Sequence, residues 1–225
     1  MRYDYITNYD SLKKRLANIG FARKNKHRFS CKANGVIQSI DFVHSVPYPK
    51  AKYYNIMISI EYPEAIRIGR ELDVFTVGVI GANIGYLSPL NSYKVWRMSE
   101  TDEEKLILSV IDEMLAYVEK YAIPFLKKYS ILDETIHEIE VGNRLFLPGA
   151  DYNLPIFYLL NGEKDFILSC LNREVQKKEA QIRKVHDDYP FTLSNIQMDS
   201  STPEYRAYKE YKTFVEKIKK YIEQG

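Results

Sequence analysis

The sequence predicts an α+β protein in which an antiparallel four- to five-stranded sheet is packed by an N-terminal helix and a long helix, with a C-terminal helical extension. Three observations support this class. Apolar residues recur at helical spacing over 9–19 and 102–128, strand-like alternation fills the stretch between them, and helical patterns dominate after residue 142. We therefore expect an α+β sheet-and-helix domain at 1–141 and a helical extension at 142–225 that is docked on it.

The first elements are a short helix and a β-hairpin. The predicted helix at 9–19 carries apolar side chains at i, i+4 and i+7, and Gly20 follows at the left-handed position that ends many helices. Alternation then predicts strands at 28–33 and 36–44. Asn34-Gly35 joins them, and both residues tolerate the positive φ angles of a type I′ turn.

Further strands complete the predicted sheet. The cleanest alternation runs from Tyr53 to Tyr62, after a loop at 46–49 and before Pro63. A β-branched run at 73–80 predicts another strand, and 93–96 predict a short one. We expect an antiparallel meander whose apolar face is covered by the first helix and the long helix.

The long helix begins with Thr101-Asp102-Glu103-Glu104, a capping-box pattern with acidic residues in the first turn. Pro124 should kink or end this helix, because proline cannot donate the helical hydrogen bond. The remaining predictions are a short helix at 132–139, a boundary within 142–153, helices at 155–160, 163–185 and 203–223, and a polar loop at 190–202.

Composition limits the class of protein. The 225 residues carry a formal net charge of +2 and include 19 tyrosines, a residue that favours half-buried strands and contact surfaces. Cys31 and Cys170 lie far apart, without the spacing or the histidine neighbours of a zinc site, so we expect neither metal nor cofactor. The N-terminus is polar and no apolar run approaches the roughly 20 residues of a membrane span, so we expect a cytoplasmic protein that does not enter a membrane.

A basic segment lies near the N-terminus. Between Ser11 and Ile40 the chain has eight basic residues and no acidic one: Lys13, Lys14, Arg15, Arg23, Lys24, Lys26, Arg28 and Lys32. Such a segment can bind nucleic acid or an acidic partner. The alternative, which we favour, is a solvated surface whose charges meet the acidic C-terminal half, because no phosphate-binding loop or RNA-binding motif accompanies them.

No catalytic motif is recognisable, and the best candidate site surrounds His44. This residue shares a strand face with Gln38 and could approach Asn55 on the adjacent strand; with Trp96 these residues form a candidate ligand-binding pocket on the sheet. We favour a structural or solvated His44, since Asp41 lies on the opposite face and is a poor orienting carboxylate. Cys31 shares a face with Phe29, which predicts a packed thiol.

Three stretches, LKKRLANIGFARKNKHRF, IQSIDFVHS and YYNIMISIEYP, resemble a bacterial family known as domain of unknown function 4304, over about residues 5–135. The resemblance implies an α+β sheet-and-helix domain and no established activity. Relatives in this family are proposed as immunity or accessory factors of toxin and conflict systems. The family would place a Gln-Lys-Ser-like triplet at the end of the second strand, where this chain has Val43-His44-Ser45 and only Ser45 matches.

These observations favour a non-catalytic binding or interaction protein, an immunity-like or regulatory partner of a toxin or conflict system. Its partner would be a protein. One alternative is an enzyme or small-ligand-binding protein with the pocket around His44. Another is nucleic-acid binding through the basic segment at 13–32.

Overall fold

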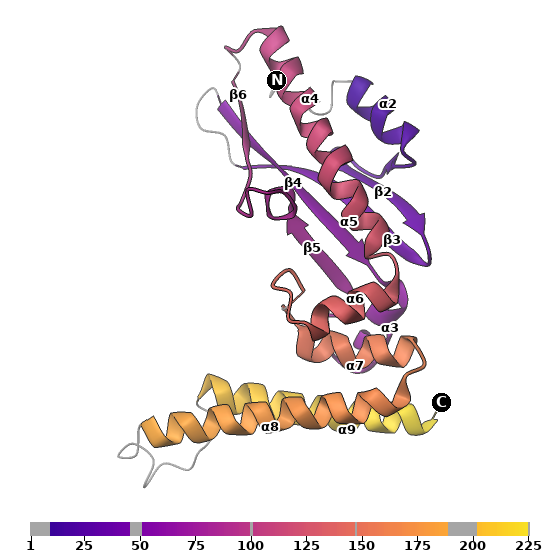
Figure 1. Cartoon of the computed structure of the whole chain (residues 1–225), viewed down its shortest axis with the longest axis vertical. Helices are drawn as coiled ribbons and strands as arrows, with labels where there is room; N and C mark the ends of the chain where they lie inside the picture. Colours follow the sequence, from indigo (N-terminus) through magenta and orange to yellow (C-terminus); the bar gives the residue numbers. More distant parts are fainter. Residues whose placement is uncertain (1–9, 46–50, 100, 147, 189–201, 225) are drawn as a thin grey trace. The chain divides into compact units, whose positions relative to one another are not determined.

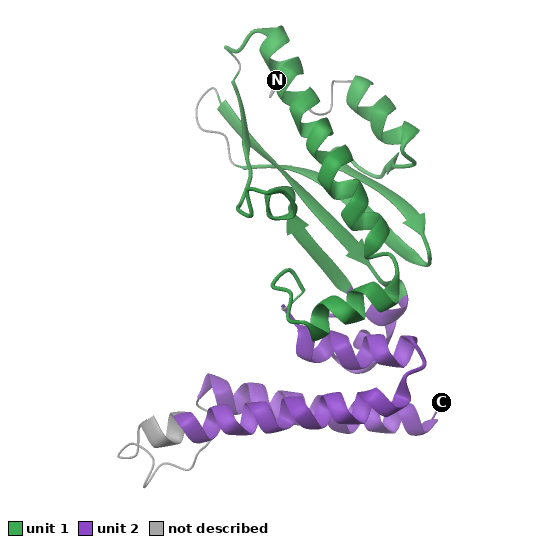
Figure 2. Cartoon of the chain, in the orientation of Figure 1, with its two compact units in different colours: residues 1–63, 79–146 green, residues 64–78, 147–225 purple. Residues whose placement is uncertain are grey.

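A computed structural model of the chain describes residues 10–45, 51–99, 101–146, 148–188 and 202–224, apart from the side chains of 185–188 (Figure 1). The loops predicted at 46–49 and 190–202 lie outside these residues, Thr202 excepted. The chain divides into two compact units (Figure 2). Unit 1 comprises 1–63 and 79–146, and unit 2 comprises 64–78 and 147–225. The sequence predicted a boundary between residues 141 and 142. It did not predict that 64–78 would group with the C-terminal part of the chain.

Unit 1 is built on an antiparallel sheet in which β1–β5 are adjacent in chain order and β6 pairs with β4. Two short strands, β1 and β6, bring the total to six. The Asn34-Gly35 turn has positive φ at both residues, as the hairpin prediction requires. The strands are β1 (Ala22–Arg23), β2 (Arg28–Ala33), β3 (Val36–His44), β4 (Ala51–Glu61), β5 (Val79–Asn83) and β6 (Trp96–Ser99).

Helices of unit 1 cover one face of this sheet, as predicted (Figure 1). They are α2 (Asp10–Asn18), α4 (Glu104–Tyr117), a π-helical turn (Val118–Ala122) and α5 (Ile123–Lys128), followed by α6 (Leu132–Glu140). Arg15 of α2 pairs with Asp112 and Glu119, which joins the first helix to the long one. The sheet presents Ile40, Phe42, Ile56 and Ile58 to these helices, all of them fully buried.

The start of the long helix differs from the prediction. The N-cap is Glu103 and makes no side-chain cap, so the predicted capping box is absent. Asp102 accepts a hydrogen bond from the amide of Ser99 at 2.6 Å. The helix continues through Pro124 to Lys128, the end of its predicted range. Since proline leaves a carbonyl unpaired four residues earlier, the helix accommodates it with the π-helical turn at 118–122.

Unit 2 is helical and contains α3 (Pro63–Glu71), α7 (Ala150–Leu160), α8 (Lys164–Asp188) and α9 (Pro203–Gln224). The first residue of α3, Pro63, is counted with unit 1. The sequence did not predict α3. The strand predicted at 73–80 is wrong over 73–78, since β5 begins at Val79 and Gly78 has a φ of 77°. The short strand predicted at 93–96 begins instead at Trp96.

Asn153 provides one contact that joins 64–78 to the rest of unit 2. Its buried amide accepts a hydrogen bond from the backbone of Gly78 at 2.8 Å and donates one to Gly149 at 3.0 Å. Within the same unit α8 and α9 lie side by side (Figure 1). Helix α9 buries an apolar stripe made of Tyr211, Phe214, Val215 and Ile218.

Candidate functional site

The four residues of the predicted sheet pocket do not converge. Val43 pairs with Asn55 and His44 pairs with Tyr54, so Asn55 and His44 point to opposite faces of the sheet. Gln38 and His44 share a face but lie six residues apart on β3, a distance of about 20 Å along a strand. No single point on the sheet is within hydrogen-bonding reach of three of these side chains.

Each of the two residues on β3 has local contacts. The Gln38 amide donates to the Leu126 carbonyl at 3.1 Å and to Ser130 Oγ at 2.6 Å, and it accepts from Cys31 Sγ at 3.2 Å. This buried network ties the sheet to the end of α5. The exposed His44 ring lies 5.2 Å from the ring of His27.

Trp96 and Asn55 also occupy separate environments. The Trp96 ring is buried at the edge of the sheet against Tyr117, with ring centroids 5.4 Å apart and the Lys94 ammonium 5.1 Å from its centre. Asn55 is only 7% exposed on the face opposite His44. Gln38 and Trp96 are therefore parts of the packed structure of unit 1.

The basic segment is partly neutralised inside unit 1. Lys13 pairs with Asp10, and Arg15 pairs with two carboxylates of the long helix. Arg28 pairs with Asp41 and Glu61 on the sheet. The Arg23 guanidinium donates to two backbone carbonyls of the turn that follows β1. The remaining members are exposed: Lys14, Lys24, Lys26 and Lys32.

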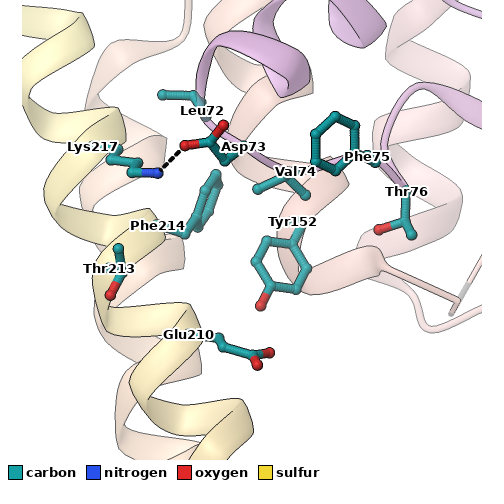
Figure 3. A pocket seen from close by; sticks show the side chains of 10 residues that line it. All are labelled: Leu72, Asp73, Val74, Phe75, Thr76, Tyr152, Glu210, Thr213, Phe214 and Lys217. Atoms are coloured by element: carbon teal, nitrogen blue, oxygen red, sulfur yellow. Dashed lines mark hydrogen bonds and ion pairs between the residues drawn. The ribbon is translucent and has the colours of Figure 1, made fainter.

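A hollow in unit 2 is the candidate site, and we call it the unit-2 hollow (Figure 3). Its volume is about 450 Å³, within the range typical of ligand pockets. It is open, because half of its lining residues are solvent-exposed. The lining comes from the turn after α3, from α7 and from α9: Leu72, Asp73, Val74, Phe75, Thr76, Tyr152, Glu210, Thr213, Phe214 and Lys217.

The turn after α3 forms one wall. The amide of Val74 donates to the Gly69 carbonyl at 2.7 Å and that of Asp73 donates to the Arg70 carbonyl at 3.2 Å. These two bonds make a Schellman motif, whose left-handed residue is usually glycine but is here Asp73, with φ of 60°. A Cβ on Gly69 would lie 2.1 Å from Val77 Cγ2, so glycine permits the close approach.

Aromatic rings form the floor. The Tyr152 ring packs edge-on against Tyr211 and Phe214, with centroids 5.3 and 5.0 Å apart. Phe214 is 2% exposed and Tyr211 is fully buried. Since both supporting rings are packed in the interior, they hold Tyr152 in place. Phe75 lies at the rim and is 79% exposed, the highest exposed fraction among the large apolar side chains of the described residues.

The charges of the hollow are separated. At one end Lys217 Nζ lies 2.5 Å from Asp73 Oδ2, and Glu210 lies at the other end beyond Tyr152 (Figure 3). Glu210 has no ion-pair partner among the described residues.

Burial, followed by the negative charges of Asp151 and Glu210, raises the pKa of Tyr152 to about 12. The Tyr152 hydroxyl is therefore neutral at physiological pH and can donate a hydrogen bond to a ligand.

This arrangement is suited to recognition through an aromatic floor, a fixed hydroxyl and an available carboxylate. No histidine or cysteine occurs among the described residues that line it. Within the described ranges no three His, Cys, Asp or Glu side chains cluster as a metal site would require. No helix in the described ranges is long and apolar enough to cross a membrane.

Sequence reasoning did not find the unit-2 hollow, although a signal was present. Glu210, Thr213 and Lys217 follow one another at i, i+3 and i+7 beside the apolar stripe of α9. Such a polar column at the edge of a buried stripe indicates a boundary with solvent. It did not indicate that the turn at 72–76 lies opposite.

The comparisons with known proteins add no relative. No family model matches the chain, and neither the curated proteins nor the solved structures give a significant match.

Proposed function

We propose that this chain is a non-catalytic, cytoplasmic binding protein that recognises a protein partner through the unit-2 hollow. The observation that carries this proposal is the combination of an open hollow with Phe75, which is 79% exposed at its rim. Burial of such a side chain contributes about 1.5–3 kcal/mol, so Phe75 is a ready anchor for an interface.

The openness of the hollow favours a protein over a small molecule. Pockets for small ligands typically enclose about 70–90% of the ligand surface, which a shallow site with an exposed rim does not do. A partner protein can cover the rim while inserting a side chain. The resemblance to domain of unknown function 4304 also favours a protein partner. The kind of partner that it implies is a toxin-like protein or a regulatory subunit.

The two alternatives have less support. A ligand site around His44 needs Asn55 on the same face, and the register of β3 and β4 separates them. Nucleic-acid binding needs a free basic surface, whereas Lys13, Arg15 and Arg28 are engaged in ion pairs within unit 1.

Site-specific photocrosslinking in the cells of origin tests the proposal. A photoreactive phenylalanine at position 75 should capture one protein as the dominant crosslinked species. The same group at Phe166, another exposed phenylalanine of unit 2, is the matched control and should not capture it. Thr213→Trp should fill the hollow and abolish capture, whereas Lys219→Trp, on an exposed part of α9, should leave it intact. Equal capture from both positions, or capture that survives Thr213→Trp, would refute the proposal.

A further inference from the structure

The charge of the unit-2 hollow is unbalanced. Its lining has two carboxylates, Asp73 and Glu210, and one ammonium, Lys217. The ammonium is already paired with Asp73 at 2.5 Å. The net negative charge therefore resides at the Glu210 end.

Glu210 is not neutralised by its own helix. Arg206 precedes it by one turn, and the two make no ion pair among the interactions of the described residues. The carboxylate instead lies beyond Tyr152 at the end of the hollow (Figure 3), close enough for its charge to help raise the pKa of the Tyr152 hydroxyl to about 12. An exposed carboxylate beside an aromatic floor attracts a cation.

The aromatic lining favours the same class of ligand. Tyr152 and Phe214 are locked together with ring centroids 5.0 Å apart, and Phe75 stands exposed at the rim. Aromatic faces attract cations through their quadrupoles, and they bind the planar guanidinium group especially well because it also stacks. Phosphate or carboxylate ligands would meet the repulsion of Glu210 and find the ammonium of Lys217 already engaged.

We propose that the unit-2 hollow binds the guanidinium of an arginine side chain on the partner, with Glu210 as its counter-ion and Tyr152 and Phe75 as its aromatic contacts. This inference rests on the proposed function and specifies the chemistry of the partner. Asp73 assists by holding Lys217 at the far end, which keeps its positive charge away from Glu210.

A nuclear magnetic resonance titration of the full chain tests this assignment. The probe is N-acetyl-arginine-N-methylamide, and its control is the citrulline derivative, which has nearly the same shape and no charge. The arginine probe should shift the amides of Thr76, Tyr152 and Thr213. It should bind about fivefold more tightly than the citrulline probe, the size expected for a solvent-exposed charge pair.

Two variants of α9 locate the effect. Glu210→Gln should remove the preference for arginine over citrulline. Glu216→Gln, the same change at an exposed site of α9 outside the hollow, should retain it. Equal binding of the two probes, no shift of the three amides, or an unchanged preference in Glu210→Gln would each overturn the inference. In these cases photocrosslinking from position 75 reports separately whether a protein partner occupies the hollow.

Discussion

Tyr211 and Pro155 form a linked pair whose energetics can be predicted from the fold. The Tyr211 hydroxyl donates to the main-chain oxygen of Asp151 at 3.1 Å. In an uninterrupted helix this oxygen would accept from the amide four residues later, but that residue is Pro155, inside α7, which has no amide hydrogen. Tyr211 thus replaces the hydrogen bond that Pro155 removes. Burial raises the pKa of Tyr211, so the hydroxyl keeps its proton.

The predicted perturbation is Tyr211→Phe. The ring is fully buried against Tyr152 and Phe214, so the substitution keeps the packing and removes only the hydroxyl. The part-buried Asp151 oxygen then loses this hydrogen bond, which costs about 0.5–1.5 kcal/mol of the free energy of unfolding. In a Pro155→Ala background the alanine amide can donate to this oxygen. There, Tyr211→Phe should cost less by about 1 kcal/mol.

Hydrogen exchange of the slowest amides of α7 and α9 measures the free energy of unfolding of unit 2 by itself. The four proteins of the cycle are the natural chain, the two single variants and the double variant. Tyr208→Phe is the control, because the Tyr208 hydroxyl donates at 2.7 Å to the carboxylate of Glu179, which is partly exposed to solvent and charged. Its loss should cost less than about 1 kcal/mol. An equal cost of Tyr211→Phe in both backgrounds would refute the reasoning.

Three further substitutions test other parts of the fold. Asn153→Ala leaves the Gly78 amide without its acceptor and should lower the stability of unit 2 by about 1–3 kcal/mol, seen as faster exchange at that amide. Gly69→Ala forces a Cβ to within 2.1 Å of Val77 and should cost about 1–3 kcal/mol while shifting the amides of 74–76; unchanged spectra would contradict this. Burial raises the pKa of Tyr62 to about 12 from the usual 10.0, so its contribution to stability is complete below pH 10 and is lost as pH rises through the folded-state pKa. Tyr62→Phe should therefore show a weaker decline of stability in alkaline titration over this range.

Local patterns predicted unit 1 well because its elements are continuous in sequence. The strands at 28–33 and 36–44 and the turn between them are confirmed residue for residue. Alternation and turn chemistry both act over a few residues, so the sequence alone specifies them. The buried polar network of Gln38 was not predicted, because its partners Leu126 and Ser130 are 88 and 92 residues away along the chain.

The segment at 64–78 was misread for a physical reason. Residues 74–80 are rich in β-branched side chains, which favour strands. Tertiary contacts override this preference: Gly78 has a positive φ, and Asn153 accepts a hydrogen bond from its amide. The unit-2 hollow depends on the same contacts, since its walls come from 72–76, from α7 and from α9. Residues that are brought together only by such long-range packing leave no local signal.

Asp73 links the stability of this turn to the proposed recognition. Its φ of 60° is a conformation that glycine adopts freely and that costs most other residues about 1–2 kcal/mol. The ion pair with Lys217 is largely exposed and contributes at most about 1 kcal/mol to the free energy of unfolding. Asp73→Gly should therefore stay within about 1 kcal/mol of the natural chain, because relief of strain offsets the lost pair and the added freedom of the unfolded chain.

The same position separates stability from binding. Asp73→Ala also loses the carboxylate but keeps the strained backbone, so it should be less stable than Asp73→Gly by about 1 kcal/mol. Both variants free the ammonium of Lys217 and should weaken binding of the arginine probe to a similar degree. Urea unfolding and the probe titration measure the two effects on the same proteins. If Asp73→Gly binds the probe as tightly as the natural chain does, then Asp73 does not restrain Lys217 for the benefit of a cationic ligand, and its left-handed conformation has another cause.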